Sequence, residues 1–305
     1  MPMNRILVAT DLSERGEGAA QRALALAGEH GAELRITHVI EADLEEATLE
    51  HLFRGQGKGA REAAEELVQA SEAQIRAQMQ RAGADEETAY TIHCTWGSPH
   101  TGIAAEAEAW QADLVVIGLH GRQGMRDLFL GATVERLAHA LSIPILVAKA
   151  VGTPPYRRVL VPVDGSQRSR RAVSEAVRLA PQAAVELLQV FDSRGIVRAL
   201  GTGGGSREEL LRITALGRAQ QEDALERFAA SLEVEVAGHV RHREVRSGEP
   251  ASAIVEVAEE RGSDLVAVGT RGLSRWQGRL LGSVARRVAQ GVTCDVLLRP
   301  DAEGD

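Results

Sequence analysis

An internal repeat constrains this chain more than any other feature. The segment RILVATDLS at 5–13 returns as RVLVPVDGS at 158–166. A longer segment, GSPHTGIAAEAEAWQADLVVIG at 97–118, returns as GEPASAIVEVAEERGSDLVAVG at 248–269. The shared residues are mostly glycines, an aspartate and apolar strand positions. Self-similarity of this kind indicates that one structural unit is present twice.

The joint between the copies lies at GTPPY, residues 152–156. Two adjacent prolines can continue neither a helix nor a central strand. A chain of 305 residues is also long enough for two domains of ordinary size. We therefore predict one domain over 1–150 and a second over 155–305.

Each copy alternates short apolar runs with segments of helical periodicity. Near-continuous apolar strands that alternate with helices predict a parallel sheet covered on both faces, an α/β fold. The second copy repeats the order of the first from Val159 to Leu298. In the first copy the predicted strands are 5–10, 33–40, 89–94, 114–118 and 145–148, and the predicted helices are 14–29, 60–82, 99–110 and 132–141.

Composition and charge exclude several classes of protein. A formal net charge of -8 without a basic block argues against binding to nucleic acid or to an anionic membrane. No apolar run approaches the roughly 18 residues of a membrane span, and the first residues lack a secretory pattern. The two cysteines, Cys94 and Cys294, cannot form a disulfide framework. We therefore expect a cytoplasmic protein with reduced thiols.

The sequence GTRGLSRWQGRLLGSV at 269–284 carries the chemistry of the second copy. Gly269 ends a strand, Gly272 follows, and Gly282 with Ser283 opens a helix. Glycine lets a ligand approach the backbone, and a helix N-terminus offers free N–H groups to an anion. The spacing G-x2-G-x9-G-S therefore predicts a phosphate site, with Ser283 both capping the helix and donating its hydroxyl.

The first copy keeps this spacing with one loss. Gly118, Gly121 and Gly131 stand at the glycine positions, but Ala132 replaces the serine. Thr133 follows one position too late to be a simple substitute. Loss of a hydroxyl donor costs on the order of 1 kcal/mol, so we expect a weaker site in this copy.

These motifs resemble those of the universal stress protein family, in its tandem form. VATDLS at 8–13 and VPVDGS at 161–166 are similar to the opening segment of the family, as are THVI at 37–40 and GLHGRQG at 118–124. The resemblance covers both halves of the chain. It implies an open five-stranded parallel sheet of order 3-2-1-4-5 in each copy. Strand ends one and four then face one crevice, the switch point at which such sheets bind ligands.

The resemblance further implies an adenine-nucleotide site, with ATP as ligand and Mg2+ as a possible companion. Asp164 would lie by the adenosine and Val190 would border adenine. Ribose and phosphates would be held by Gly269, Gly272, Gly282, Ser283 and the backbone of Val284. The matching first-copy positions are Asp11, Val39, Gly118, Gly121 and Gly131.

Other interpretations of the same residues stay open. Asp11 and Asp164 could each simply cap the following helix. His239 and His242 have a spacing that suggests metal ligands, but on a strand they would point to opposite faces, so we predict no metal site. Without a nucleophile motif, zinc pair or Walker sequence we predict no catalytic residue. A slow Mg-dependent ATPase and a nucleotide-free binder of an apolar ligand remain alternatives.

We therefore predict a regulatory nucleotide-binding protein of the stress response. The nucleotide would favour one arrangement of loops or subunits, and an unidentified protein partner would recognise it. Apolar edge strands are costly to expose. We accordingly expect the two copies to form an internal pseudo-dimer through 145–148 and 296–298, with a homodimer as a further possibility.

Overall fold

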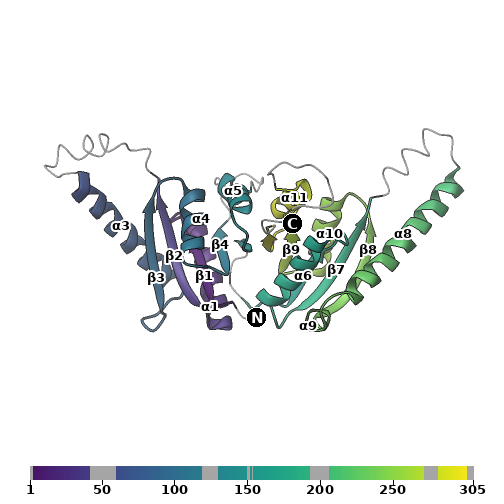
Figure 1. The fold of residues 1–305 in the computed structure, drawn as a ribbon, viewed down its shortest axis with the longest axis horizontal. Helices are drawn as coiled ribbons and strands as arrows, with labels where there is room; N and C mark the ends of the chain where they lie inside the picture. Colours follow the sequence, from purple (N-terminus) through teal and green to yellow (C-terminus); the bar gives the residue numbers. More distant parts are fainter. Residues whose placement is uncertain are drawn as a thin grey trace. The chain divides into compact units, whose positions relative to one another are not determined.

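The computed structural model describes residues 3–41, 60–118, 130–149, 152, 154–192, 206–270 and 281–300. The chain forms two compact units, one built mainly from residues before Pro155 and the other mainly from Pro155 onward. We call them the first and the second domain. Each is described by itself below (Figure 1).

The first domain is a five-stranded parallel sheet with strand order β3-β2-β1-β4-β5. Helices α1 and α3 pack together on one face, and α4 and α5 pack together on the other. The strands are β1 (Arg5–Ala9), β2 (Glu33–Ile40), β3 (Tyr90–Trp96), β4 (Leu114–Gly118) and β5 (Ile145–Ala148). The helices are α1 (Glu14–His30), α3 (Ala60–Arg81), α4 (Pro99–Ala109) and α5 (Ala132–Ala140).

The second domain repeats this order as β8-β7-β6-β9-β10, again with parallel strands. The predicted fold class and strand order are therefore confirmed for both copies. Its strands are β6 (Arg158–Pro162), β7 (Ala184–Phe191), β8 (Val240–Ser247), β9 (Leu265–Gly269) and β10 (Asp295–Arg299). Its helices are α6 (Gln167–Leu179), α8 (Arg207–Ala230), α9 (Val234–Ala237), α10 (Pro250–Arg261) and α11 (Ser283–Gly291).

The central strands form the core of each domain. Ile6, Leu7 and Val8 of β1 are completely buried, as are Leu160 and Val161 of β6. Helices cover both faces of these strands, which is why their sequences are apolar without alternation. Among the described residues, no helix combines the length and apolar character needed to cross a bilayer.

Local sequence signals set the helix that follows the first strand of each domain. The hydroxyl of Ser13 accepts from the backbone N–H of Gly16 at the start of α1, and Ser166 accepts from Ser169 at the start of α6. Gly31 ends α1 at φ 64°, a left-handed conformation that favours glycine. Both helices thus begin directly after the strand end that carries the predicted aspartate.

Candidate functional site

Each domain has a cavity at the carboxyl ends of its strands. This is the switch point between β1 and β4 in the first domain, and between β6 and β9 in the second. The cavities measure about 270 Å³ and 330 Å³. The described residues that line each cavity belong to its own domain alone.

The second cavity brings together most of the residues predicted for it from the glycine motif and from the family resemblance. The ends of β6, β7 and β9 and the start of α11 all contribute to it. Among its lining residues are Asp164, Val190, Gly269, Gly282, Ser283 and Val284. Gly272 lies outside the described residues. Segments far apart in the chain therefore meet here, as the strand order requires.

The first cavity contains most of the corresponding positions. Asp11, Val39 and Gly118 line it, together with Thr133 of α5. Gly131 is the residue directly before α5, but it is not among the lining residues. Gly121 lies outside the described residues. At the start of the last helix, the first domain therefore contributes Thr133 to its cavity. The second domain contributes Ser283 and Val284 at the same place.

The start of α11 corrects one prediction about Ser283. The N-cap is Gly282, and Ser283 is the first helical residue, so the serine hydroxyl does not cap the helix. Gly282 has φ -55° and ψ 142°, and Gly131 has φ -58° and ψ 148°. These values are open to every residue type. A left-handed turn is therefore not the reason for glycine at either position.

Asp11 and Asp164 hold the loop before the first helix of each domain. Asp11 Oδ1 accepts from the backbone N–H of Ser13 at 3.1 Å and from its hydroxyl at 2.6 Å. Asp164 Oδ1 accepts from the N–H of Ser166 at 3.0 Å. The serines are the N-caps, so the interpretation of the aspartates as simple caps is wrong. The aspartates instead fix the residues that cap.

Helices α4 and α10 contribute a wall to each cavity that was not predicted from the sequence. Pro99 and Ile103 line the first cavity, and Pro250 and Ile254 line the second. Both pairs are identical between the two copies of the repeat. That internal identity was the available signal, because neither proline nor isoleucine suggests ligand chemistry by itself.

Comparison with known proteins gives the chain its family. The sequence model of the universal stress protein family matches residues 3–149 of this chain and matches it again over residues 155–300. The chain belongs to the universal stress protein family. The repeated match makes it a tandem member, as its motifs predicted.

This tandem universal stress protein resembles some known proteins in sequence and others in fold. A universal stress protein of Mycolicibacterium smegmatis is 32% identical over 196 residues, which are 61% of this chain and 61% of that protein. One of Methanocaldococcus jannaschii is 34% identical over 47% of this chain and 81% of its own length. The crystal structure of a universal stress protein from Archaeoglobus fulgidus covers 99% of this chain and 98% of its own, at 20% identity and TM-score 0.63. That structure supports the fold alone.

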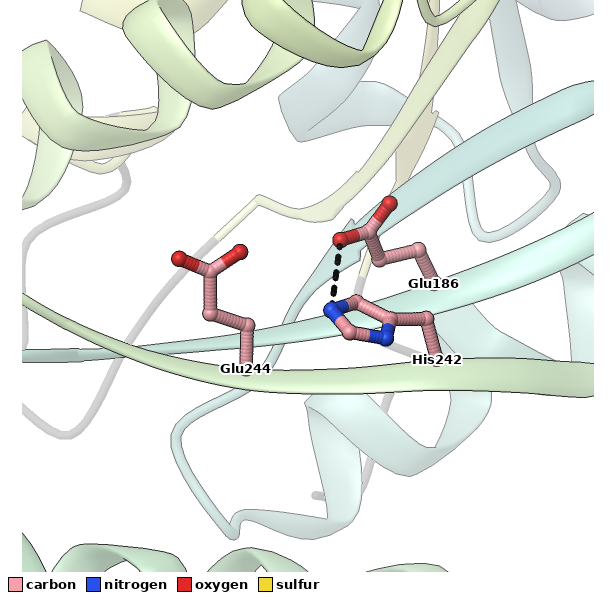
Figure 2. A group of neighbouring side chains, drawn as sticks. All are labelled: Glu186, His242 and Glu244. Atoms are coloured by element: carbon pink, nitrogen blue, oxygen red, sulfur yellow. Dashed lines mark ion pairs between the residues drawn. The ribbon is translucent and has the colours of Figure 1, made fainter.

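A second group of polar side chains lies on the sheet of the second domain, away from the cavity. Figure 2 shows Glu186 of β7 beside His242 and Glu244 of β8. Their potential metal-binding atoms lie within 4.8 Å of one another, and His242 Nε2 is 3.6 Å from Glu186 Oε1. A bulge between Val185 and Glu186 sets His242 opposite Glu186. His239 precedes β8, so the His239 and His242 spacing does not describe this group.

The residues of this group do not fit a metal centre, because arginines already bind its carboxylates. Arg261 donates to Glu244 Oε2 at 3.0 Å, and its Nε lies 3.4 Å from Glu186 Oε1. Arg246 donates to Glu244 Oε1 at 2.8 Å. A metal ion would have to displace Arg261 from between two carboxylates. The arrangement is an ion-pair network.

The first domain carries a different set of side chains at the same place. Arg35 stands where the second domain has Glu186, and Trp110 stands where it has Arg261. The Arg35 guanidinium donates to Glu106 Oε1 at 2.7 Å and lies 4.6 Å from the centre of the Trp110 ring. The two domains thus keep one fold while their sheet surfaces have diverged.

We expect the network to make the stability of the second domain depend on pH in the acid range. Burial acts to raise the pKa of Glu244, but hydrogen bonds and charge from Arg246 and Arg261 outweigh it and lower that pKa. Ionised Glu244 therefore adds stability above its ordinary pKa, and this stability is lost as pH falls through the lowered value. We expect Glu244→Gln to melt below wild type at pH 7, with the difference vanishing well below pH 4.

Thermal melts of both proteins between pH 7 and pH 3 check this expectation. Glu226→Gln is the control, since Glu226 pairs with Arg243 in an exposed ion pair that should matter little at any pH. A constant difference between Glu244→Gln and wild type across this range would contradict the argument.

Proposed function

We propose that this tandem universal stress protein binds an adenine nucleotide, ATP, and acts as a regulatory protein of the stress response. The observation that carries the proposal is the convergence in the second cavity. Six positions derived from the motif and the family resemblance line one cavity at the switch point: Asp164, Val190, Gly269, Gly282, Ser283 and Val284.

The chemistry of the cavity suits the two ends of a nucleotide. Val190, Ile254 and Val268 provide apolar walls for a flat base. Gly282 and Ser283 open α11, whose first N–H groups and dipole favour a phosphate. Asp164 is oriented by the N–H of Ser166 and can accept from a ribose hydroxyl.

A magnesium ion fits only in company with the nucleotide. Asp164 is the one acidic side chain among the described residues that line the second cavity. Magnesium bound by one carboxylate takes its other ligands from phosphates and water. The slow ATPase alternative rests on this same carboxylate, and phosphate release that Asp164→Ala abolishes would favour it.

Mass spectrometry of protein purified without added ligand tests the proposal most directly. We expect a retained adenine nucleotide, and calorimetry with ATP should give at least one site per chain. Protein that carries no nucleotide and gives no heat with ATP would overturn the proposal. A retained apolar molecule would favour the apolar-ligand alternative.

The exposed hydroxyl of Ser283 is expected to strengthen phosphate binding. Ser283→Ala should weaken ATP binding at the second cavity by up to roughly tenfold, equivalent to about 1.4 kcal/mol. The matched change, Ala132→Ser in the first domain, should leave binding there unchanged or tighten it. Calorimetry of both variants checks the ranking of the two copies. Full affinity in Ser283→Ala would reverse it.

A further inference from the structure

The two cavities differ in their threonines: Thr10, Thr37 and Thr133 line the first, and Thr270 lines the second. Apolar walls such as Ile103 and Ile254 are the same in both, and Val39 matches Val190. Three positions change in one direction, from a threonine in the first cavity to an aliphatic residue in the second: Thr10 to Val163, Thr37 to Leu188, and Thr133 to Val284.

Thr37 is the unusual member of this set. The residue is 0% exposed, yet it lines the first cavity. Its Oγ1 has no hydrogen-bond partner in the described part of the chain. Thr10 differs, because its hydroxyl donates to Gln78 Oε1 at 2.7 Å and accepts from the N–H of Leu12 at 3.0 Å. The Thr10 hydroxyl is therefore used within the protein, and that of Thr37 is not.

The position of Thr37 on β2 places it on the face of the sheet that α4 covers. Residues two apart on a strand share a face, so Thr37 lies on the same face as Val39. Val39 faces α4, since a Cβ added to Gly102 would lie 2.8 Å from Val39 Cγ2. Ile103 of α4 lines the same cavity. Thr37 is therefore part of the inner wall, beneath α4.

An unpartnered buried hydroxyl lowers stability, because it loses water and gains no partner. The fold does not require one here, since Leu188 occupies the equivalent position of β7 and is itself completely buried. Valine has nearly the shape of threonine and would remove the cost. A polar group kept at this cost in a cavity wall points to a ligand that completes its hydrogen bonding.

We propose that Thr37 recognises the ligand of the first cavity, so that the two domains select different ligands. The first would take a heterocycle with a hydrogen-bonding edge at its buried end. The second would take a ligand that presents a hydrocarbon or ring face at the same place, against Leu188. This proposal rests on the proposed function in one respect, because it treats both cavities as ligand sites.

The test is Thr37→Val in the full chain, measured with and without ATP. Without ligand, the variant should melt a few degrees above wild type, since an unsatisfied hydroxyl is removed at constant shape. With ATP, in a Gly282→Val background that blocks the second cavity, its affinity should fall about tenfold. Leu188→Thr is the matched control and should melt below wild type, because it adds an unpartnered hydroxyl and removes hydrocarbon.

The outcomes separate this proposal from the proposed function. If ATP binds the first cavity and Thr37→Val binds it equally well, recognition by Thr37 is wrong while nucleotide binding stands. If neither cavity binds ATP, the proposed function fails. The melting temperature of Thr37→Val without ligand then tests the proposal about Thr37. A Thr37→Val protein that melts at or below wild type shows a structural hydroxyl and overturns the proposal. A Thr37→Val protein that melts above wild type shows that the hydroxyl does not stabilise the fold, which supports a role in ligand recognition.

Discussion

Gly282→Val is expected to abolish ATP binding at the second cavity while the unliganded protein keeps its fold. Gly282 lines the cavity at the start of α11, where a phosphate would have to contact the backbone. A valine side chain would fill that space. We expect affinity to fall at least about a hundredfold, equivalent to roughly 2.8 kcal/mol.

The backbone at Gly282 explains why the fold should survive. Its φ of -55° and ψ of 142° suit valine, and its N–H donates to the Thr270 carbonyl at 2.7 Å whatever the side chain. Loss of glycine as an N-cap should cost no more than about 1 kcal/mol. Thermal melts with and without ATP separate the two effects.

Gly131→Val is the matched control for this prediction. Gly131 has nearly the same backbone angles at the start of α5, so its substitution should cost similar stability but leave the second cavity intact. A Gly282→Val protein that loses stability without ATP and keeps its full ATP-dependent gain would reject the phosphate site.

Tyr156→Phe is expected to lower the free energy of unfolding of the second domain by about 2–3 kcal/mol. The Tyr156 hydroxyl donates to Asp295 Oδ2 at 2.6 Å. Tyr156 is 3% exposed and Asp295 is 0% exposed. Phenylalanine would leave a carboxylate oxygen of Asp295 buried without this donor, at the first residue of β10.

Urea unfolding of the full chain measures this effect. Tyr90→Phe is the control, because Tyr90 is the other tyrosine of the chain and lies, partly exposed, at the start of β3. It should change stability by less than about 0.5 kcal/mol. Equal effects of the two substitutions would show that the buried pair contributes no special stability.

The fold was predictable from the sequence because its signals are local and repeated. Short apolar runs, helical periodicity and the strand-end aspartates recur in both copies, so each supports the other. The order of the strands in the sheet could not be predicted from such local signals. It came from the family resemblance, since an apolar run such as 114–118 does not state which strand it will pair with.

The cavity was predictable only where glycine and aspartate have distinctive chemistry. Thr37 and Ile103 were not predicted as cavity residues, because their place in the cavity wall comes from the packing of α4 across β2. The cap at Gly282 was misassigned, since serine is the more usual N-cap. The grouping of His242 with Glu186 depends on a bulge, which strand alternation within one segment cannot reveal.

Each cavity is lined, in the described part of the chain, by residues of its own domain only. Covalent linkage therefore fixes the two cavities at a ratio of one to one, whatever the abundance of the protein in the cell. Expression cannot raise one without the other. Substitutions in one cavity also leave the lining residues of the other unchanged, so the two halves of the gene can diverge separately while the messenger, the dosage and the turnover stay shared.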